Sequence, residues 1–311
     1  MNDAKQKILS NAQSICLDIL DEFIDVCDKN NLSWFADSGT LLGAIRHGGF
    51  IPWDDDVDVV MPRKDYDFLH DNPQLFSKPY VLMTETSAAS NFQLCMQLAD
   101  ESTTKLDVCS LSTIEKARKE KEHFRFSHSV SIDIVPLDNA PSDKELATLH
   151  HFCKALLHYW TLRYYSYSEY NTFLDRQSYK AAVRFFNDTM KKISYVNRNS
   201  DRLMASSWLY ADSCKPITRK EAYSKSLLLP FKGLKHLIRV PAGYDEVLRQ
   251  YYGDYMTPVK TSEDHIELNS ERITAIFDAL PSAEYERFSN EHLIQMISEG
   301  RLLSESKGER K

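Results

Sequence analysis

Acidic side chains are concentrated in one short stretch of this 311-residue chain, residues 37–61. Four of the five positions from 54 to 58 carry aspartate, namely Asp54, Asp55, Asp56 and Asp58. Valines surround these aspartates, and an ionised carboxylate is costly beside core-forming residues unless a cation offsets its charge. The stretch therefore predicts a metal site.

Strand geometry indicates which of these aspartates belong together. If residues 54–60 are extended, Asp54, Asp56 and Asp58 share one face, and Asp55 points the other way. Mg²⁺ takes oxygen ligands, typically one or two carboxylates plus waters and substrate phosphates. We therefore expect Mg²⁺ here, with Mn²⁺ as an alternative. The competing interpretation, that the aspartates cap turns or face solvent, does not account for the alternating valines.

Asp133 is a further candidate, because it lies between two isoleucines in a second strand-like segment. It would add a carboxylate from a neighbouring strand, either as a metal ligand or as a general base. A calcium-binding loop that starts at Asp54 is excluded. Its sixth position would be Val59 rather than glycine, and its twelfth would be Asp65 rather than glutamate.

A turn of small residues, Ser38, Gly39 and Thr40, precedes a predicted short helix that ends at Arg46. A glycine lets a phosphate group approach the backbone, and a helix N-terminus offers N–H groups to an anion. We therefore expect this turn to bind the phosphates of a nucleotide. Arg46 and His47 are additional candidates for contact with phosphate.

The composition is that of an ordinary globular protein, with 42% hydrophobic and 27% charged residues. The net charge of −7 argues against nucleic-acid binding by phosphate neutralisation. The six cysteines form no CxxC pair, which favours reduced thiols in the cytoplasm over zinc or disulfides. We find neither a signal peptide's apolar core at the N-terminus nor an apolar run long enough to span a membrane.

The remaining pattern predicts helices and strands around the acidic stretch. Strands are expected at residues 32–36, 57–61, 80–85, 92–98 and 130–135, and helices at 4–29, 40–46, 65–70, 142–204 and 244–252. Residues 136–141 form a turn-rich boundary, and 227–240 are strand-like around Gly233. Arg63 and Lys64 are more typical of surface residues than of phosphate contacts. The charged run at 116–122 favours a solvated helix or loop, and the aromatic segment 159–170 favours packing over a cage for a quaternary ammonium group.

Three segments resemble the signature blocks of the LicD family, which also includes the fukutin-related proteins. They are SGTLLGAIRHGGFIPWDDDVDVVMPR at 38–63, SIDIVPLDNAP at 131–141, and VPAGYDEVLRQYYGDYMTP at 240–258, which His265 follows. Two positions depart from the pattern: Ser38 stands where glycine is common, and Lys232 stands where an acidic residue is expected.

The resemblance implies an α+β fold with a nucleotidyltransferase-like mixed sheet, flanked by helices and followed by a mainly helical C-terminal part. The expected organisation is an N-terminal helix (1–31), a catalytic core (32–141), a mainly helical substrate-side region (142–265) and a helical tail (266–311). By motif position, Asp56 and Asp58 would be the principal metal ligands, with Asp54 assisting and Asp133 as a third acidic strand residue. The resemblance also implies Mg²⁺-dependent transfer of phosphocholine, or a similar phospho-alcohol, from a CDP-activated donor to a glycan hydroxyl of lipopolysaccharide or teichoic acid.

Two alternatives share these residues. A nucleotidyltransferase would move the nucleotide itself and release pyrophosphate instead of CMP, and a non-catalytic scaffold would bind nucleotide only. The expected partners are a CDP-alcohol donor and a glycan or glycolipid acceptor, without nucleic acid. A lipid-linked acceptor would bring a cytoplasmic protein to the inner face of the membrane.

Overall fold

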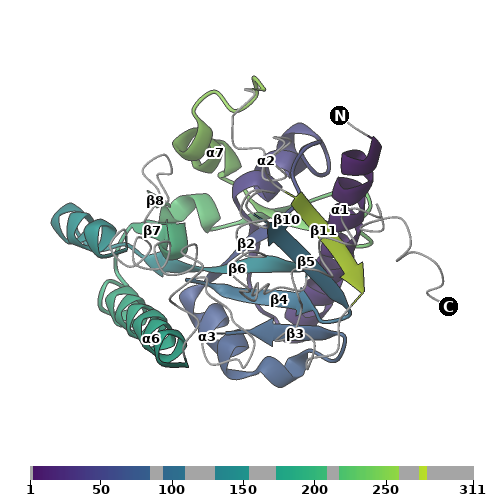
Figure 1. The fold of residues 1–311 in the computed structure, drawn as a ribbon. Coiled ribbons are helices and arrows are strands. Elements are labelled where there is room, and N and C mark those ends of the chain that lie inside the picture. Colours follow the sequence, from purple (N-terminus) through teal and green to yellow (C-terminus); the bar gives the residue numbers. More distant parts are fainter. Residues whose placement is uncertain are drawn as a thin grey trace.

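The computed structural model describes residues 3–84, 94–108, 130–153, 173–208, 217–258 and 273–278. Its centre is a mixed sheet with the strand order β1-β2-β6-β4-β3, to which β7 is added beside β6, and β8 beside β7 (Figure 1). The strands are β1 (Phe35–Ala36), β2 (Asp58–Pro62), β3 (Tyr80–Met83), β4 (Met96–Asp100), β6 (Val130–Asn139), β7 (Arg202–Ala205) and β8 (Ile217–Arg219). Only β2 and β6 are parallel among these pairs.

Strand β6 is the organising strand, because it exchanges one partner for another along its length. Its first half pairs with β4 up to Ile134, and its last three residues pair with β7 from Leu137. Pro136 falls between these two partners, where its missing N–H interrupts neither ladder. The sequence suggested a turn-rich boundary from Pro136 onward, and this was wrong because the strand continues to Asn139.

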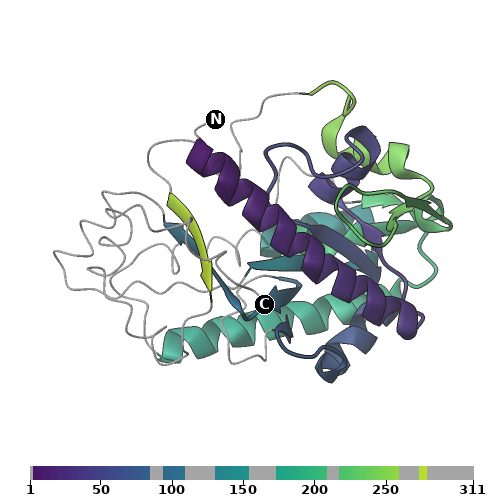
Figure 2. The same cartoon turned by 90° about the vertical axis from the view of Figure 1, so that its right-hand side faces the viewer.

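Helices cover the apolar face of the sheet. The 27-residue helix α1 (Asp3–Lys29) crosses β4 and β6 (Figure 2) and buries a stripe that includes Ile15, Ile19 and Phe23. The other helices are α2 (Ser38–Arg46), α3 (Arg63–Asp71), α6 (Phe173–Val196), α7 (Tyr244–Tyr252), a helical segment at 143–153, and the short 3₁₀ turns Pro73–Leu75, Ser206–Trp208 and Lys220–Tyr223. Together with the sheet they confirm the predicted α+β class.

Alternation along β2 and β6 separates the two faces of the sheet. Val59 and Ile134 belong to the large core that α1 helps to form. Val60 and Val135 point to the opposite face, where they pack with Cys95. Asp58 and Asp133 have the same parity as these two valines, so the acidic residues lie on the face opposite α1.

A buried ion pair joins α3 to β6. We expected Arg63 at the surface, but it is 6% exposed. It donates two hydrogen bonds, of 2.7 and 2.6 Å, to the Asp138 carboxylate. Burial alone would lower the pKa of Arg63, but the Asp138 carboxylate outweighs this effect and raises it. Arg63 is therefore a structural residue that holds a helix against the central strand.

Two further antiparallel pairs lie outside the main sheet: β9 (Ser226–Leu229) with β10 (Ile238–Pro241), and β5 (Thr103–Val108) with β11 (Ile273–Asp278). Strand β11 falls within 266–311, where we expected helix. The charged run at 116–122 and the aromatic segment 159–170 lie outside the described residues. Among the described helices, none combines the length and apolarity needed to cross a bilayer.

Candidate functional site

Three polar side chains stand in a row across the sheet. Asp58 on β2 is opposite Asp133 on the parallel strand β6, and Asp133 is opposite Gln97 on the antiparallel strand β4. Directly paired residues share a face of a sheet. Gln97 Nε2 donates a hydrogen bond of 2.7 Å to Asp133 Oδ1. The register of three strands thus brings together residues that are distant in sequence.

Asp58 is surrounded by negative charge. Its side chain is 8% exposed, and burial raises its pKa well above the usual value. The carboxylates of Asp56, Asp133, Asp37 and Asp54 raise this pKa further, in that order. Like charges gathered around a buried carboxylate are characteristic of a place where a cation or a proton is taken up.

Helix α1 forms hydrogen bonds to the main chain of the acidic loop, residues 54–57, that precedes β2. Gln13 Nε2 donates a 2.8 Å hydrogen bond to the carbonyl oxygen of Asp54, and the Cys16 thiol donates to that of Asp55 at 3.7 Å. The strand begins only at Asp58, so residues 54–57 are loop rather than the regular strand we considered. Asp55 is not among the charges that raise the pKa of Asp58.

The N-terminus of α2 is joined to the start of β2. The Asp58 amide donates to Thr40 Oγ1 at 2.9 Å. Ser38 adopts a φ of +48°, the left-handed region that favours glycine. A Cβ atom on Gly39 would lie 2.5 Å from Asp54 Oδ2, so only glycine fits there without displacing that carboxylate. The helix end that we expected to receive phosphate therefore has the Asp54 carboxylate beside it, an arrangement that the helix dipole favours.

Asp37 is a site residue that the sequence did not single out. It is fully buried, and its Oδ2 accepts hydrogen bonds from Ser38 at 3.2 Å and from the Tyr251 hydroxyl at 3.4 Å. Burial raises the pKa of Tyr223 well above its usual value, and the charge of Asp37 adds to this effect. The position of Asp37 directly before the Ser-Gly turn was the only local signal that could have indicated it.

Arg46 and His47 lie at the other end of α2 from the Ser38–Thr40 turn. Arg46 is seven positions after Gly39 along the helix, which is roughly 10 Å at 1.5 Å per residue. Arg46 Nη1 donates to the carbonyl oxygen of Tyr255 at 2.7 Å, and His47 is exposed. Partial burial and the neighbouring Arg46 lower the pKa of His47. The structure does not bring these two residues to the acidic row, by which we mean Asp58 and Asp133 on β2 and β6.

Comparison with known proteins identifies the family. The model described as "LicD/FKTN/FKRP, nucleotidyltransferase domain" matches residues 31–141. The lipopolysaccharide cholinephosphotransferase LicD of Haemophilus influenzae is 30% identical over 265 residues, an alignment that covers 81% of this chain and 92% of that relative. The chain belongs to the LicD family. Uncharacterised proteins of Rickettsia prowazekii and Rickettsia typhi are 49% identical over 41 residues, 13% of this chain and 15% and 13% of theirs.

The LicD family match contains the whole row from Asp58 to Gln97 as well as Asp37, whereas Tyr251 lies outside it. Lys232, the departure from the family pattern, is exposed, and its backbone N–H donates to the carbonyl oxygen of Gly48 at 2.8 Å. Its main-chain contact thus supports the Gly48–Gly49 turn that follows α2.

The acidic row of this LicD family member offers the carboxylate oxygens that a divalent cation takes as ligands. Among the described residues, no group of three or more His, Cys, Asp or Glu side chains is arranged to hold a metal ion alone. Mg²⁺ bound with a phosphate substrate needs only one or two protein carboxylates, because waters and phosphate oxygens complete its shell. Asp58, together with the partly exposed Asp56 and Asp133, satisfies that smaller requirement.

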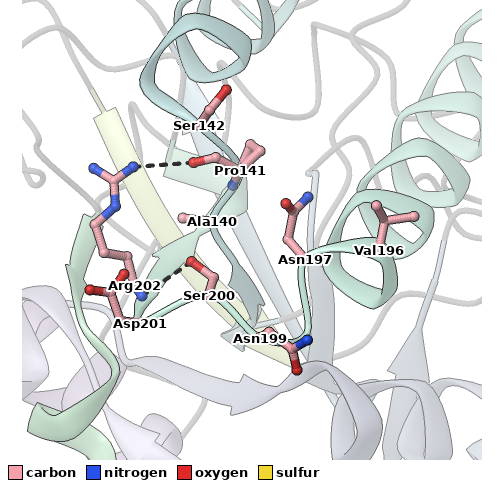
Figure 3. Close-up of a pocket in the computed structure, with 9 residues that line it drawn as sticks. All are labelled: Ala140, Pro141, Ser142, Val196, Asn197, Asn199, Ser200, Asp201 and Arg202. Carbon is pink, nitrogen blue, oxygen red and sulfur yellow. Dashed lines mark hydrogen bonds between the residues drawn. The ribbon is translucent and has the colours of Figure 1, made fainter.

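A separate hollow of about 290 Å³ lies between the 140–142 turn and the 196–202 turn (Figure 3). Arg202 crosses it and donates to the carbonyl oxygen of Pro141 at 3.2 Å. The hollow lies past Asn139, the last residue of β6. Asp133 is six residues before Asn139 on this strand, or roughly 20 Å away, so the hollow is separate from the acidic row. None of the predicted site residues lines this hollow.

Proposed function

We propose that this protein transfers phosphocholine, or a similar phospho-alcohol, from a CDP-activated donor to a hydroxyl group of a surface glycan, with release of CMP. Membership of the LicD family supports a transferase, and the printed name of the Haemophilus influenzae relative supports phosphocholine and lipopolysaccharide as the group and the acceptor. Teichoic acid is a second acceptor of the same chemical kind. The protein would act in the cytoplasm, and a lipid-linked acceptor would bring it to the membrane surface.

One observation carries the proposal: the buried Asp58 lies opposite Asp133 on the next strand, and the charge of Asp56 raises the pKa of Asp58. A diphosphate is highly charged, and carboxylates repel it unless a divalent cation lies between them. The residues that would hold Mg²⁺, or Mn²⁺, are Asp56 and Asp58, with Asp54 assisting. When bound, the cation supplies positive charge that offsets the charge developing on the departing phosphate.

The chain's own residues would orient the reacting groups. In the transfer, the acceptor oxygen forms a bond to the phosphorus of phosphocholine, and the bond from that phosphorus to the bridging oxygen breaks. The electron pair leaves on the phosphate of CMP. Asp133, which is partly exposed and lies opposite Asp58, would take the proton of the acceptor hydroxyl or bind a second cation.

The test is Mg²⁺-dependent release of CMP from CDP-choline, CDP-ethanolamine, CDP-ribitol and CDP-glycerol, with purified lipopolysaccharide or teichoic acid as the acceptor. We expect one donor to be consumed, and Asp58→Asn to lose at least about 10³-fold in rate, because it removes a principal ligand. Asp55→Asn is the matched control, since that buried neighbour does not act on Asp58, and it should keep the Mg²⁺-dependent activity.

The product separates the alternatives. Release of pyrophosphate from a nucleoside triphosphate would replace the proposal with nucleotidyl transfer. Binding of CDP-alcohols without turnover for any acceptor would indicate a non-catalytic scaffold. Wild-type rates in a folded Asp58→Asn variant would rule out the acidic row as the reaction centre.

A further inference from the structure

Gln97 occupies a buried position beside the acidic row. It lies in β4, between β3 and β6, and its side chain is 7% exposed. The face it shares with Asp133 also carries Cys95, two residues earlier on the chain. Burial raises the pKa of the Cys95 thiol, and the charges of Asp133 and Asp58 raise it further. This flank of Asp133 is therefore poorly hydrated, and a hydrogen bond there has a larger effect than one in water.

The orientation of the Gln97 amide follows from its partner. Nε2 lies 2.7 Å from Asp133 Oδ1, and the opposite orientation would place two acceptor oxygens at that distance. Oε1 must therefore point away from Asp133. In the part of the chain that the structure describes, this buried oxygen accepts no hydrogen bond.

A buried amide oxygen that accepts no hydrogen bond destabilises the protein in the absence of substrate. Leucine has a similar volume and would avoid this loss. A residue whose role is only to fill the core would not need an amide at this position. The amide therefore points to a role in the site, because buried unsatisfied groups in native proteins are commonly tied to function.

We propose that Gln97 is a positioning residue that holds the Asp133 carboxylate in a fixed orientation toward the divalent cation and the substrate, an inference that rests on the proposed function. Asp133 is partly exposed, so its carboxylate would otherwise rotate. The hydrogen bond to Oδ1 fixes that rotation. Groups that orient a metal-binding carboxylate in this way typically change metal affinity or activity 10- to 100-fold when they are removed.

The decisive variants are Gln97→Leu, which removes both polar atoms at similar volume, and Gln97→Met, whose unbranched side chain adapts if leucine disturbs packing. Gln74→Leu is the matched control, because Gln74 is exposed and bonds only to Asn72 among the described residues. Three quantities are measured for each protein: urea denaturation without metal, calorimetric titration with MnCl₂ alone, and Mg²⁺-dependent CMP release from CDP-choline with lipopolysaccharide.

We expect the Gln97 variants to be as stable as the wild type or more so, to bind Mn²⁺ about 10- to 100-fold more weakly, and to release CMP more slowly by a similar factor. Gln74→Leu should match the wild type in both binding and rate. Mn²⁺ affinity and rate unchanged in a folded Gln97 variant, especially one that has lost stability, would show a purely structural role and overturn the inference.

The outcomes also separate this inference from the proposed function. If the wild type neither binds Mn²⁺ nor releases CMP from any CDP-alcohol, the proposed function fails and the inference fails with it. If the wild type does both and Asp58→Asn does neither, while the Gln97 variants behave like the wild type, only the inference is wrong.

Discussion

The backbone N–H of Asp37 donates a 3.0 Å hydrogen bond to the carbonyl oxygen of Asp58. This bond joins the residue before α2 to the first residue of β2. A second hydrogen bond joins the same two segments, because Thr40 Oγ1 accepts from the Asp58 amide. The turn before α2 and the acidic strand therefore form one unit. A disturbance at either end of this unit should reach the acidic row.

Replacement of Thr40 by valine tests this unit. Thr40 is 2% exposed, and Thr40→Val keeps its shape but leaves the Asp58 amide without its acceptor. We expect a loss of about 1–3 kcal/mol in the free energy of unfolding, measured by urea denaturation. Thr40→Ser retains the hydroxyl and should lose less. Equal losses in the two variants would mean that packing, and not the hydrogen bond, is what matters at Thr40.

Gly39→Ala should destabilise the protein although alanine is the better helix former. Helix propensity alone predicts a gain of up to about 1 kcal/mol, whereas the added Cβ would lie 2.5 Å from Asp54 Oδ2. We expect a net loss of stability and slower CMP release. Asp54→Ala removes the obstructing carboxylate, so Gly39→Ala should be tolerated better in that background. A double-mutant cycle measures the coupling, and additive effects would contradict the contact.

The pair of Arg63 and Asp138 should be strongly coupled. Arg63→Met leaves the buried Asp138 carboxylate without this cation, and Asp138→Leu leaves Arg63 with the longer 3.4 Å contact to Asp67. We expect either variant to lower the free energy of unfolding by about 3–5 kcal/mol. The double variant should be far more stable than the sum of these losses predicts, because no charge is then left buried. Chemical denaturation of the four proteins gives the coupling, which would be near zero if water replaced the missing partner.

His236 should make stability depend on pH. Asp21 accepts a 2.8 Å hydrogen bond from its ring and raises its pKa above the usual 6.5, with the charge of Asp25 adding to the effect. Protonated His236 therefore stabilises the fold. This contribution is complete below pH 6.5 and is lost as the pH rises through the raised pKa.

Urea denaturation between about pH 5.5 and 8.5 checks this, with His236→Gln as the comparison. The difference in unfolding free energy between the two proteins should be largest at the acidic end and shrink as the pH rises. Parallel pH profiles for the two proteins would show that the ion pair with Asp21 contributes nothing to this dependence.

Local pattern was sufficient to predict part of the site. Acidic residues at alternate positions next to valines indicated that Asp54, Asp56 and Asp58 belong to one site. In the structure, the charges of Asp54 and Asp56 are among those that raise the pKa of Asp58. Asp133 was indicated by the isoleucines beside it, and its register opposite Asp58 agrees with that expectation. The roles of these residues as ligands or base remain predictions.

Contacts between distant segments could not be predicted from the sequence. Gln97 faces Asp133 only because β4 pairs antiparallel with β6 in one register, and no local pattern specifies a register. Tyr251 reaches Asp37 across 214 positions, and Arg63 reaches Asp138 across 75. The sequence also did not predict that β6 continues through Pro136. No local pattern indicates that β7 replaces β4 as its partner there.

Helix α1 leaves the ribosome well before the strands that it covers. It ends at Lys29, whereas β6 begins at Val130, about 100 residues further on. At 5–20 residues per second, translation of that interval takes roughly 5–20 s. During this time the apolar stripe of α1, including Ile19 and Phe23, lacks the strand that will bury it. Until β6 is made, the nascent chain therefore exposes an apolar surface of the kind that chaperones bind, and a product truncated before β6 would retain it.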